Sequence, residues 1–350
     1  MRKFQIIIYG SYGYTGQLIV EECKSKNLNV LLSGRNEDKL AAQSNETGYP
    51  YEIIETHDEK ALKKLLLQGD IVIHCGGPFK YTAKQMAIAC LETKTHYTDI
   101  TGEYEVFELM AEYDKPAKER GILIMPGVGF DVVPSDCLAL HLKKRLPEAT
   151  HLNLAFVTTA GGLSRGTNKT MVETLGLGGT IRIDGKLTTI PMGHDVKEID
   201  FGAFSSKAMC IPWGDISTAW RSTGIQNIKV YMAVHEKMIK NVKIGNWLGW
   251  LLRQRWVKNY MLKKIDKGPA GPSEEKRNKG RSLLWGKAWN EQGTEIEARL
   301  DVPSGYLLTA KTAVLIAEKL LNTEVRSGYF TPAQYFGEGL ILEIESAKYF

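Results

Sequence analysis

The sequence predicts an α/β protein with two domains: an N-terminal doubly wound parallel sheet, and a second α+β domain built on a mixed or antiparallel sheet. Three observations support this. Short apolar runs alternate with helix-compatible segments over the first third of the 350 residues, as in a parallel sheet with helical crossovers. A glycine-rich turn follows the first of these runs. After about residue 135, strand-like runs follow one another closely, with an Asp184-Gly185 hairpin signal among them.

The first third contains six strand-like runs that are mostly apolar. They are residues 4–9, 29–33, 51–54, 70–75, 95–99 and 121–125. Apolar strands of this kind are typical of a sheet that helices cover on both faces. Residues 16–25 are compatible with the first of those helices. In such a sheet, ligands bind at the carboxyl ends of the strands.

The remainder of the chain has a different rhythm. Strand-like runs occur at residues 151–157, 180–190, 196–201 and 226–234, and helices are expected at 237–265 and 306–321. The segment 268–272 holds two prolines and two glycines and should end the first of these helices. We therefore expect a first domain over 1–134, a second over 135–302, and a C-terminal segment, 303–350, that packs back on the first.

The composition is ordinary for two globular domains, with 43% hydrophobic and 24% charged residues. No apolar run approaches the roughly 20 residues of a membrane-spanning helix. The chain passes from Met1 directly into a strand-like run, so we expect no signal peptide and a cytoplasmic location. Five cysteines without C-x-x-C spacing favour packed thiols over disulfides or a zinc site, and the histidines show no metal-ligand spacing.

Residues 10–16 lie between the first predicted strand and the first predicted helix. Glycine at this point permits a tight turn, the close approach of a phosphate to backbone N–H groups, and close packing of helix on strand. This context predicts a Rossmann dinucleotide site, the alternative being an ordinary glycine-rich turn. The predicted cofactor contacts are Gly10, Ser11, Tyr12, Gly13, Tyr14, Thr15 and Gly16.

The end of the second strand indicates which dinucleotide binds. An acidic residue there would hold the ribose hydroxyl of NAD and repel a 2′-phosphate. This chain has Ser33, Arg35 and Asn36 instead, and its first acid is Glu37. A guanidinium with neutral hydrogen-bonding neighbours suits a phosphate, so NADP(H) is favoured, with NAD(H) as the alternative. Arg35 as a solvated loop residue is the other interpretation.

A second glycine pair follows the fourth strand. Gly76 and Gly77, with Pro78 and Phe79, lie where the chain must pass close to the nicotinamide ribose. Paired glycines permit that approach, and proline stiffens the turn. These four residues are therefore also predicted cofactor contacts.

Several stretches together resemble the saccharopine dehydrogenase-like oxidoreductases, a group that includes bacterial trans-acting enoyl reductases. They run from end to end of the chain: 9–16, 76–79, 96–103, 129–136, 268–277 and 305–310. The resemblance implies a Rossmann domain followed by a second α/β domain, and an oxidoreductase activity. It does not imply true saccharopine oxidoreduction, and it leaves the substrate open.

Hydride transfer is the chemistry of the cofactor, so the protein has to position the substrate and manage one proton. Tyr97, Asp99 and Glu103 cluster at the end of the fifth strand and in the turn after it, and Asp131 follows the sixth. We expect Tyr97 to donate the proton and Asp131 to orient substrate. The alternative is that Tyr97 and Asp99 bond locally and hold the loop in shape.

A further glycine-rich segment, 161–167, leads into a predicted helix. A helix N-terminus with an arginine suits a carboxylate or thioester oxygen. Ser164, Arg165 and Thr167 are therefore the predicted contacts to an acyl or other small-molecule substrate, and a plain loop is the alternative.

Three of the seven tryptophans lie within ten positions, at Trp247, Trp250 and Trp256. Lysines and arginines are interspersed, and residues 237–281 hold thirteen of them against three acids. This mixture suits peripheral contact of 240–265 with a membrane surface. Packing on the second domain, or a homodimer contact, is the alternative. No nucleic-acid-binding motif accompanies the charge, so no nucleic acid partner is expected.

Three functions are compatible with these observations. The first is an NADPH-dependent reductase acting on a C=C or C=O bond of an acyl or lipid-like substrate. The second is an amino-acid imine dehydrogenase of the saccharopine type, which requires several arginines for its carboxylates. The third is a non-catalytic NADP(H)-binding protein associated with a membrane or a partner.

Overall fold

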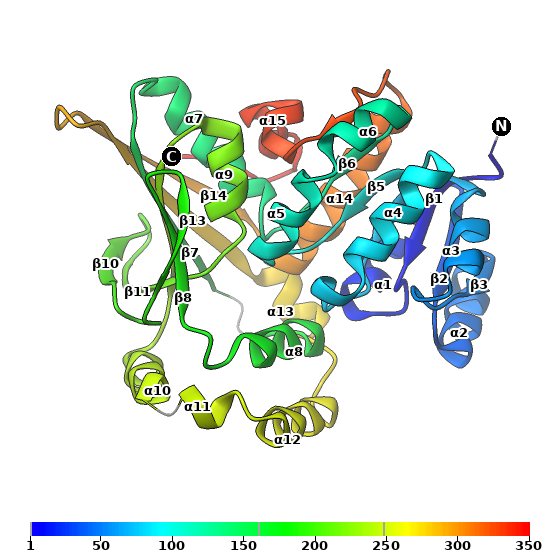
Figure 1. The fold of residues 1–350 in the computed structure, drawn as a ribbon, viewed down its shortest axis with the longest axis horizontal. Coiled ribbons are helices and arrows are strands. Elements are labelled where there is room, and N and C mark those ends of the chain that lie inside the picture. Colours follow the sequence, from blue (N-terminus) through cyan, green and yellow to red (C-terminus); the bar gives the residue numbers. More distant parts are fainter. Residues whose placement is uncertain (1, 160–161, 248) are drawn as a thin grey trace. The chain divides into compact units, whose positions relative to one another are not determined.

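The structure is a computed structural model that describes residues 2–159, 162–247 and 249–350 (Figure 1). The chain forms two compact units: unit 1 comprises Met1–Val133 and Tyr306–Tyr335, and unit 2 comprises Pro134–Gly305 and Phe336–Phe350. Of the segment expected to return to the first domain, only the part from 306 to 335 does so. The last fifteen residues belong to unit 2 because β16 (Lys348–Tyr349) pairs with β14 (Glu295–Pro303) there.

Unit 1 is built on a seven-stranded sheet in the order β15-β6-β5-β4-β1-β2-β3. Its strands are β1 (Phe4–Tyr9), β2 (Val30–Gly34), β3 (Tyr51–Ile53), β4 (Gly69–His74), β5 (His96–Asp99), β6 (Leu123–Met125) and β15 (Gly328–Tyr329). Every pair in this sheet is parallel. The order reverses direction between β1 and β4, which is the Rossmann arrangement, and dinucleotides bind at that reversal. The predicted fold class is confirmed.

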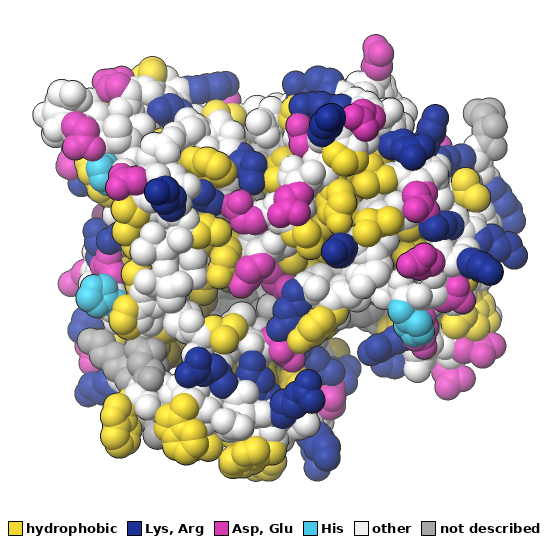
Figure 2. All heavy atoms as spheres, viewed as in Figure 1, with side chains coloured by type: hydrophobic (Ala, Val, Ile, Leu, Met, Phe, Trp, Pro, Cys, Tyr) yellow, Lys and Arg dark blue, Asp and Glu magenta, His cyan; other side chains and the backbone are white. Residues whose placement is uncertain are grey.

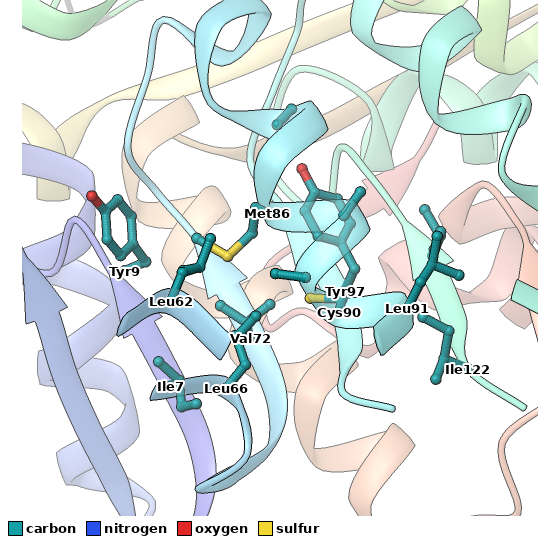
Figure 3. Close-up of a cluster of buried hydrophobic side chains, with 14 of the residues drawn as sticks. Ile7, Tyr9, Leu62, Leu66, Val72, Met86, Cys90, Leu91, Tyr97 and Ile122 are labelled. Carbon is teal, nitrogen blue, oxygen red and sulfur yellow. The ribbon is translucent and has the colours of Figure 1, made fainter. Parts of the chain in front are cut away.

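Helices cover both faces of this sheet. They are α1 (Tyr14–Ser25), α2 (Glu37–Thr47), α3 (Glu59–Leu66), α4 (Ala83–Thr93), α5 (Tyr104–Ala111), α6 (Asp114–Arg120), α14 (Gly305–Leu321) and α15 (Pro332–Phe336), with the short turn η1 (Phe79–Tyr81). Side chains of α3 to α6 form one core with Ile7 and Val72 (Figure 3). Ile6 and Ile8 alternate to the other face, where α1 and α14 meet through Lys26 and Glu318, 3.5 Å apart.

Unit 2 is built on a mixed sheet in the order β10-β11-β12-β7-β13-β14-β16. Its further strands are β7 (His151–Thr158), β8 (Gly179–Ile183), β9 (Lys186–Ile190), β10 (Val196–Asp200), β11 (Ser205–Ile211), β12 (Asn227–Ala233) and β13 (Arg281–Trp289). Among the described strands of this second sheet, only β12 and β7 pair in parallel. β8 and β9 form the hairpin predicted from Asp184-Gly185, whose φ angles of 48° and 74° suit the twist of a hairpin.

The helices of unit 2 are α7 (Val133–Arg145), α8 (Arg165–Thr174), α9 (Asp215–Thr223), α10 (Glu236–Trp247), α11 (Gly249–Leu252), α12 (Arg255–Asp266) and α13 (Glu274–Lys279), with η2 (Glu338–Glu343). The single helix predicted over 237–265 is thus three shorter ones. No helix in the part of the chain that the structure describes is both long and apolar enough to cross a membrane.

Candidate functional site

The glycine loop joins β1 to α1 at the point where the strand order of unit 1 reverses. Gly10 has a φ of 79°, which favours glycine, and a Cβ there would lie 3.0 Å from the carbonyl carbon of Cys75 and the nitrogen of Gly76. The turns that follow β1 and β4 therefore touch through bare backbone. Any side chain at Gly10 would push them apart.

Gly13 and Gly16 shape the start of α1. A Cβ at Gly16 would lie 2.4 Å from the carbonyl oxygen of Gly10 and 2.7 Å from that of Ser11, so the helix packs directly on the loop. Gly13 occupies the N-cap position and provides no side chain to cap the helix. A helix start without a side-chain cap, reached through a glycine cradle, fits a phosphate group.

Neighbouring elements hold the loop in place. The carbonyl of Ser33 accepts hydrogen bonds from the N–H groups of Gly10 at 2.7 Å and Ser11 at 3.3 Å. The buried amide of Gln43 on α2 donates to the carbonyl of Ser11 at 2.9 Å. The hydroxyl of Ser11 itself is buried and has no hydrogen-bond partner within the described residues, as expected of a group that awaits a ligand oxygen. Sequence reasoning missed Gln43, because a glutamine within a helix carries no motif.

Two exposed cations flank the end of β2. The ring of Tyr12 packs on Gly34, where a Cβ would lie 2.5 Å from the ring atom Cε1, and its hydroxyl accepts the N–H of Arg35 at 3.2 Å. The Nζ atom of Lys39 lies 5.6 Å from the centroid of the same ring. Tyr12 thus contacts the backbone of Arg35 and the ammonium group of Lys39, and the two exposed cations at the end of β2 suit a 2′-phosphate.

Ser33 and Asn36 each form a hydrogen bond that holds the local fold. Ser33 is completely buried, and its hydroxyl donates to the carbonyl of Glu52 at 2.9 Å, linking β2 to β3. The side-chain oxygen of Asn36 accepts the N–H of Lys39 at 2.9 Å and caps α2. The phosphate contact predicted for the buried Ser33 is therefore corrected, whereas the exposed Asn36 uses only its side-chain oxygen and its phosphate contact stays a prediction.

The turn after β4 is fixed by a buried histidine. Thr82 donates from its hydroxyl to the carbonyl of Gly76 at 2.9 Å, and Nε2 of His74 lies 2.9 Å from that hydroxyl. Since the threonine proton is used on Gly76, His74 must donate from Nε2. Burial lowers the pKa of His74 to about 3, so the ring is neutral. Neither His74 nor Thr82 was identified from the sequence.

The predicted cofactor contacts of this turn, residues 76–79, differ in how much space they leave beside the backbone. A Cβ at Gly76 would lie 2.9 Å from the ring of Tyr9. At Gly77 it would meet only the Phe79 ring, at 3.4 Å. Pro78 precedes η1, and the Phe79 side chain is buried in the core. The open backbone of this turn is therefore at Gly77.

Tyr97 lies inside the core of unit 1 and not at its surface (Figure 3). Its hydroxyl donates to Oδ2 of Asp99 at 2.5 Å. Oδ1 of Asp99 accepts the N–H groups of Thr101 at 3.0 Å and Gly127 at 2.8 Å. Burial raises the pKa of Tyr97 well above its usual value and that of Asp99 to about 6. A fully buried hydroxyl bonded to a carboxyl cannot reach a substrate, so the proton-donor role predicted for Tyr97 is corrected to a structural one.

Glu103 and Asp131 complete the polar groups at this end of the sheet. Glu103 accepts the N–H groups of Phe79 and Lys80, both at 2.9 Å, and so shapes the turn after β4. Asp131 packs on Gly102, where a Cβ would lie 2.5 Å from its Oδ2 atom. Burial, and then the nearby Glu103, raise the pKa of Asp131 to about 7. Asp131 is therefore the carboxyl group best suited to exchange a proton near neutral pH.

The predicted substrate contacts in unit 2 serve a local structural purpose. Ser164 caps α8 by accepting the N–H of Thr167 at 3.1 Å, and their hydroxyls lie 3.0 Å apart. Arg165 donates to the carbonyl of Asp266, at the end of α12, at 3.4 Å. Arg165 thus links α8 to the end of α12, whereas Ser164 and Thr167 shape the start of α8; their contact with a substrate stays a prediction. Gly161, at the start of the same segment, lies outside the described residues.

The described side chains contain no group of three or more His, Cys, Asp or Glu able to hold a metal ion. The five cysteines are free. The site therefore consists of the glycine loop, the Arg35–Lys39 pair, the turn after β4 and Asp131.

Comparison with known proteins agrees with this geometry. Residues 6–125 match the family described as saccharopine dehydrogenase NADP binding domain. The saccharopine dehydrogenase-like oxidoreductase of Mus musculus is 29% identical over 208 residues, which cover 52% of this chain and 48% of that protein. A lipid droplet localized protein of Caenorhabditis elegans is 29% identical over 198 residues, 51% of this chain and 46% of that one.

A trans-acting enoyl reductase of Mycobacterium ulcerans is 27% identical over 155 residues, covering 42% of this chain and 37% of that protein. The chain thus spans about half the length, or less, of these curated relatives. Among solved structures, an apo saccharopine dehydrogenase (L-Glu forming) from Saccharomyces cerevisiae superposes with a TM-score of 0.67. It is 13% identical, with 99% of this chain and 100% of that chain covered, and so shares the fold.

Both the motif order and the observed Rossmann sheet agree with the family match. Residues 6–125 match the saccharopine dehydrogenase NADP binding domain, and the chain is similar to saccharopine dehydrogenase-like oxidoreductases over about half of its length.

Proposed function

We propose that the protein is an NADPH-dependent reductase that acts on a C=C or C=O bond of an acyl or lipid-like substrate. The observation that carries the proposal is the pairing of an uncapped, glycine-lined start of α1 with the cations Arg35 and Lys39 at the end of β2. One element suits a pyrophosphate and the other a 2′-phosphate. A relative named trans-acting enoyl reductase and another named lipid droplet localized protein support the substrate class.

The residues of unit 1 would divide the work of holding NADPH. Gly10, Gly13 and Gly16 leave room for the pyrophosphate at the start of α1, and Ser11 offers its buried hydroxyl. Arg35 and Lys39 would neutralise the 2′-phosphate. NADPH supplies the hydride when bound.

Asp131 would provide the proton that the reduced carbon or oxygen requires. With a pKa of about 7, its carboxyl is half protonated at neutral pH, where proton transfer in either direction is efficient. Glu103, which raises that pKa, also fixes the turn after β4 through Phe79 and Lys80. Glu103 thus affects both the backbone of the turn after β4 and the protonation of Asp131.

Substrate-dependent oxidation of NADPH tests the proposal. Enoyl thioesters, enones and aldehydes of increasing chain length should be compared, following NADPH absorbance. We expect turnover with at least one of these classes, and its loss in the Gly13→Asp variant, which places a carboxylate where a phosphate should bind. NADPH binding without turnover on the whole series would contradict the reductase proposal and favour a non-catalytic NADP(H)-binding protein.

The imine dehydrogenase alternative is supported by the fold that the chain shares with saccharopine dehydrogenase, but by no cluster of arginines identified in the described residues. That reaction requires arginines to bind several carboxylates, and Arg165, its candidate, is engaged with the end of α12.

A further inference from the structure

Helices α10, α11 and α12 of unit 2 carry the most exposed aromatic side chains of the described residues. Trp247 is 83% exposed, Tyr260 69%, Trp256 66% and Trp250 62%, and no other large apolar side chain in the described ranges exceeds 59%. Isolated exposed apolar residues are normal, but a group of aromatic rings on adjoining elements marks an interaction surface. Figure 2 shows hydrophobic side chains protruding along the lower edge, where Figure 1 places the three helices.

The opposite side of these helices is already attached to unit 2. Lys207 pairs with Glu236 at 2.5 Å at the start of α10, and Gly249 of α11 is buried against Gly176. Lys258 of α12 donates to the carbonyl of Glu173 at 2.6 Å. Lys169 of α8 pairs with Asp266, also at 2.6 Å, at the end of α12. The aromatic rings therefore lie on the side that faces away from these attachments.

Helix α12 arranges aromatic and basic residues in one stripe. Trp256 and Tyr260 are four residues apart, so they occupy the same face. Lys263 and Lys264 follow on that face one turn later, and all four side chains are exposed. An amphipathic helix that combines indole or phenol rings with lysines is the pattern of helices that lie in a membrane interface.

The positive charge around the aromatic rings indicates which kind of surface they bind. Residues 237–267 contain nine lysines and arginines and one acid, Asp266. A symmetric dimer through this surface would bring two like-charged patches together, which opposes association. A surface of anionic phospholipid headgroups complements the charge and accepts the rings at headgroup depth.

We propose that the exposed side of α10–α12 docks on a membrane surface that carries anionic phospholipids. Trp247, Trp250, Trp256 and Tyr260 insert at headgroup level, and the neighbouring lysines and arginines bind the anionic headgroups. No described helix is suited to span the bilayer, so the contact is peripheral. This inference depends on the surface of unit 2 alone and stands apart from the proposed reductase activity.

Flotation of the full chain with vesicles tests the proposal, using phosphatidylcholine with and without phosphatidylserine. We expect binding to the phosphatidylserine vesicles that weakens as salt rises. Trp256→Ser with Tyr260→Ser should lower partitioning by at least about tenfold. Lys263→Gln with Lys264→Gln should lower it by about 25-fold, from roughly fivefold for each lysine.

Matched controls lie on α3 of unit 1 and at its C-cap, Leu67. Leu67→Ser removes an exposed apolar side chain, and Lys60→Gln with Lys64→Gln removes two exposed lysines four residues apart. Both controls should bind vesicles as the original chain does. Equal binding to the two kinds of vesicle, no binding to either, or binding unaffected by the α12 variants would overturn the proposal. So would dissociation of a dimer by the Trp256 and Tyr260 variant in light scattering, which would assign the surface to a second copy of the chain.

Discussion

Tyr97 and Asp131 show how burial separates residues that look alike as candidates in the sequence. Tyr97 lies in β5 and Asp131 follows β6, both near the end of the sheet where ligands bind, and both carry a titratable group. The structure closes Tyr97 inside the core with Asp99 as its partner, whereas Asp131 is only partly buried. The residue types and their spacing predicted a polar cluster here, but only packing reveals which member is accessible.

The first prediction concerns Tyr97→Phe. Removing the hydroxyl leaves Oδ2 of Asp99 without its donor, so we expect a loss of about 1–2 kcal/mol in the free energy of unfolding. The rate of the proposed reduction and the affinity for NADPH should stay within about threefold. A general acid contributes about 100-fold or more to the rate, so a loss of that size with intact folding would restore Tyr97 as the proton donor.

The second prediction concerns Asp131→Asn and pH. In the original chain, reduction should slow as pH rises above about 7, because the carboxyl that donates the proton becomes ionised. In the variant the rate should fall by about 100-fold or more and lose this pH dependence. A variant with an unchanged pH–rate profile would remove Asp131 from the mechanism.

The same substitution has a stability effect whose sign is fixed. The pKa of Asp131 is raised, so between about pH 4 and pH 7 the folded chain binds more protons than the unfolded chain. The free energy of unfolding should therefore fall as pH rises through this range. Asp131→Asn should remove that component, and thermal unfolding of both chains across the range measures it.

At the scale of elements, the glycine loop was predictable because its function is backbone geometry. Gly10, Gly13 and Gly16 are recognisable by spacing after a strand, and the structure gives each a close contact or a helix cap. The supports of the loop were not predictable. Gln43 on α2 and Thr82 before α4 act through single hydrogen bonds to backbone carbonyls that come near only once the sheet has formed.

The third prediction tests that loop with two glycines. Gly16→Ala places a Cβ 2.4 Å from the carbonyl oxygen of Gly10, so the loop must shift. We expect the free energy of unfolding to fall by a few kcal/mol and NADPH binding to be lost. Gly166→Ala on α8 is the control, because its Cβ would meet only the Ser164 hydroxyl at 3.6 Å. It should be neutral or stabilise the chain by up to about 1 kcal/mol. Similar behaviour of the two variants would contradict the close packing of α1 on the loop.

Unit 2 shows where patterns in the sequence are weakest. The hairpin of β8 and β9 was predicted because Asp184-Gly185 specifies a turn. Strands β11, β13 and β14 were not predicted, although β13 and β14 pair over nine residues. Charged residues such as Lys287 and Arg299 interrupt their apolar pattern, and ion pairs with Glu295 and Asp200 satisfy those charges only in the assembled sheet.

For the molecule as a whole, the sequence predicted two units and the passage of the chain from the first to the second near residue 134. It also predicted the return of the chain to unit 1, in the segment that contains α14. It did not predict that residues 336–350 leave again for unit 2, because the two residues of β16 are too short a strand to recognise.

The fourth prediction concerns the stability of the chain with NADPH bound, because a ligand that binds only the folded chain stabilises it. NADPH at about 100 times its dissociation constant should raise the free energy of unfolding of the domain that binds it by about 2.7 kcal/mol. If the two units unfold separately, only the transition of unit 1 should move. Calorimetry of the full chain with and without NADPH measures this, and a shift confined to unit 2 would place the cofactor elsewhere.

The most direct test of the account is calorimetric titration of the full chain, and of Arg35→Ala with Lys39→Ala, with NADPH and NADH. We expect the original chain to bind NADPH more tightly than NADH, and the double variant to lose about 10- to 100-fold or more in NADPH affinity while NADH affinity stays unchanged. This follows because the 2′-phosphate is the only group that distinguishes the two ligands. Equal affinities in the original chain, or a variant that weakens both ligands alike, would contradict the assignment of Arg35 and Lys39 to the 2′-phosphate and of the cofactor to NADPH.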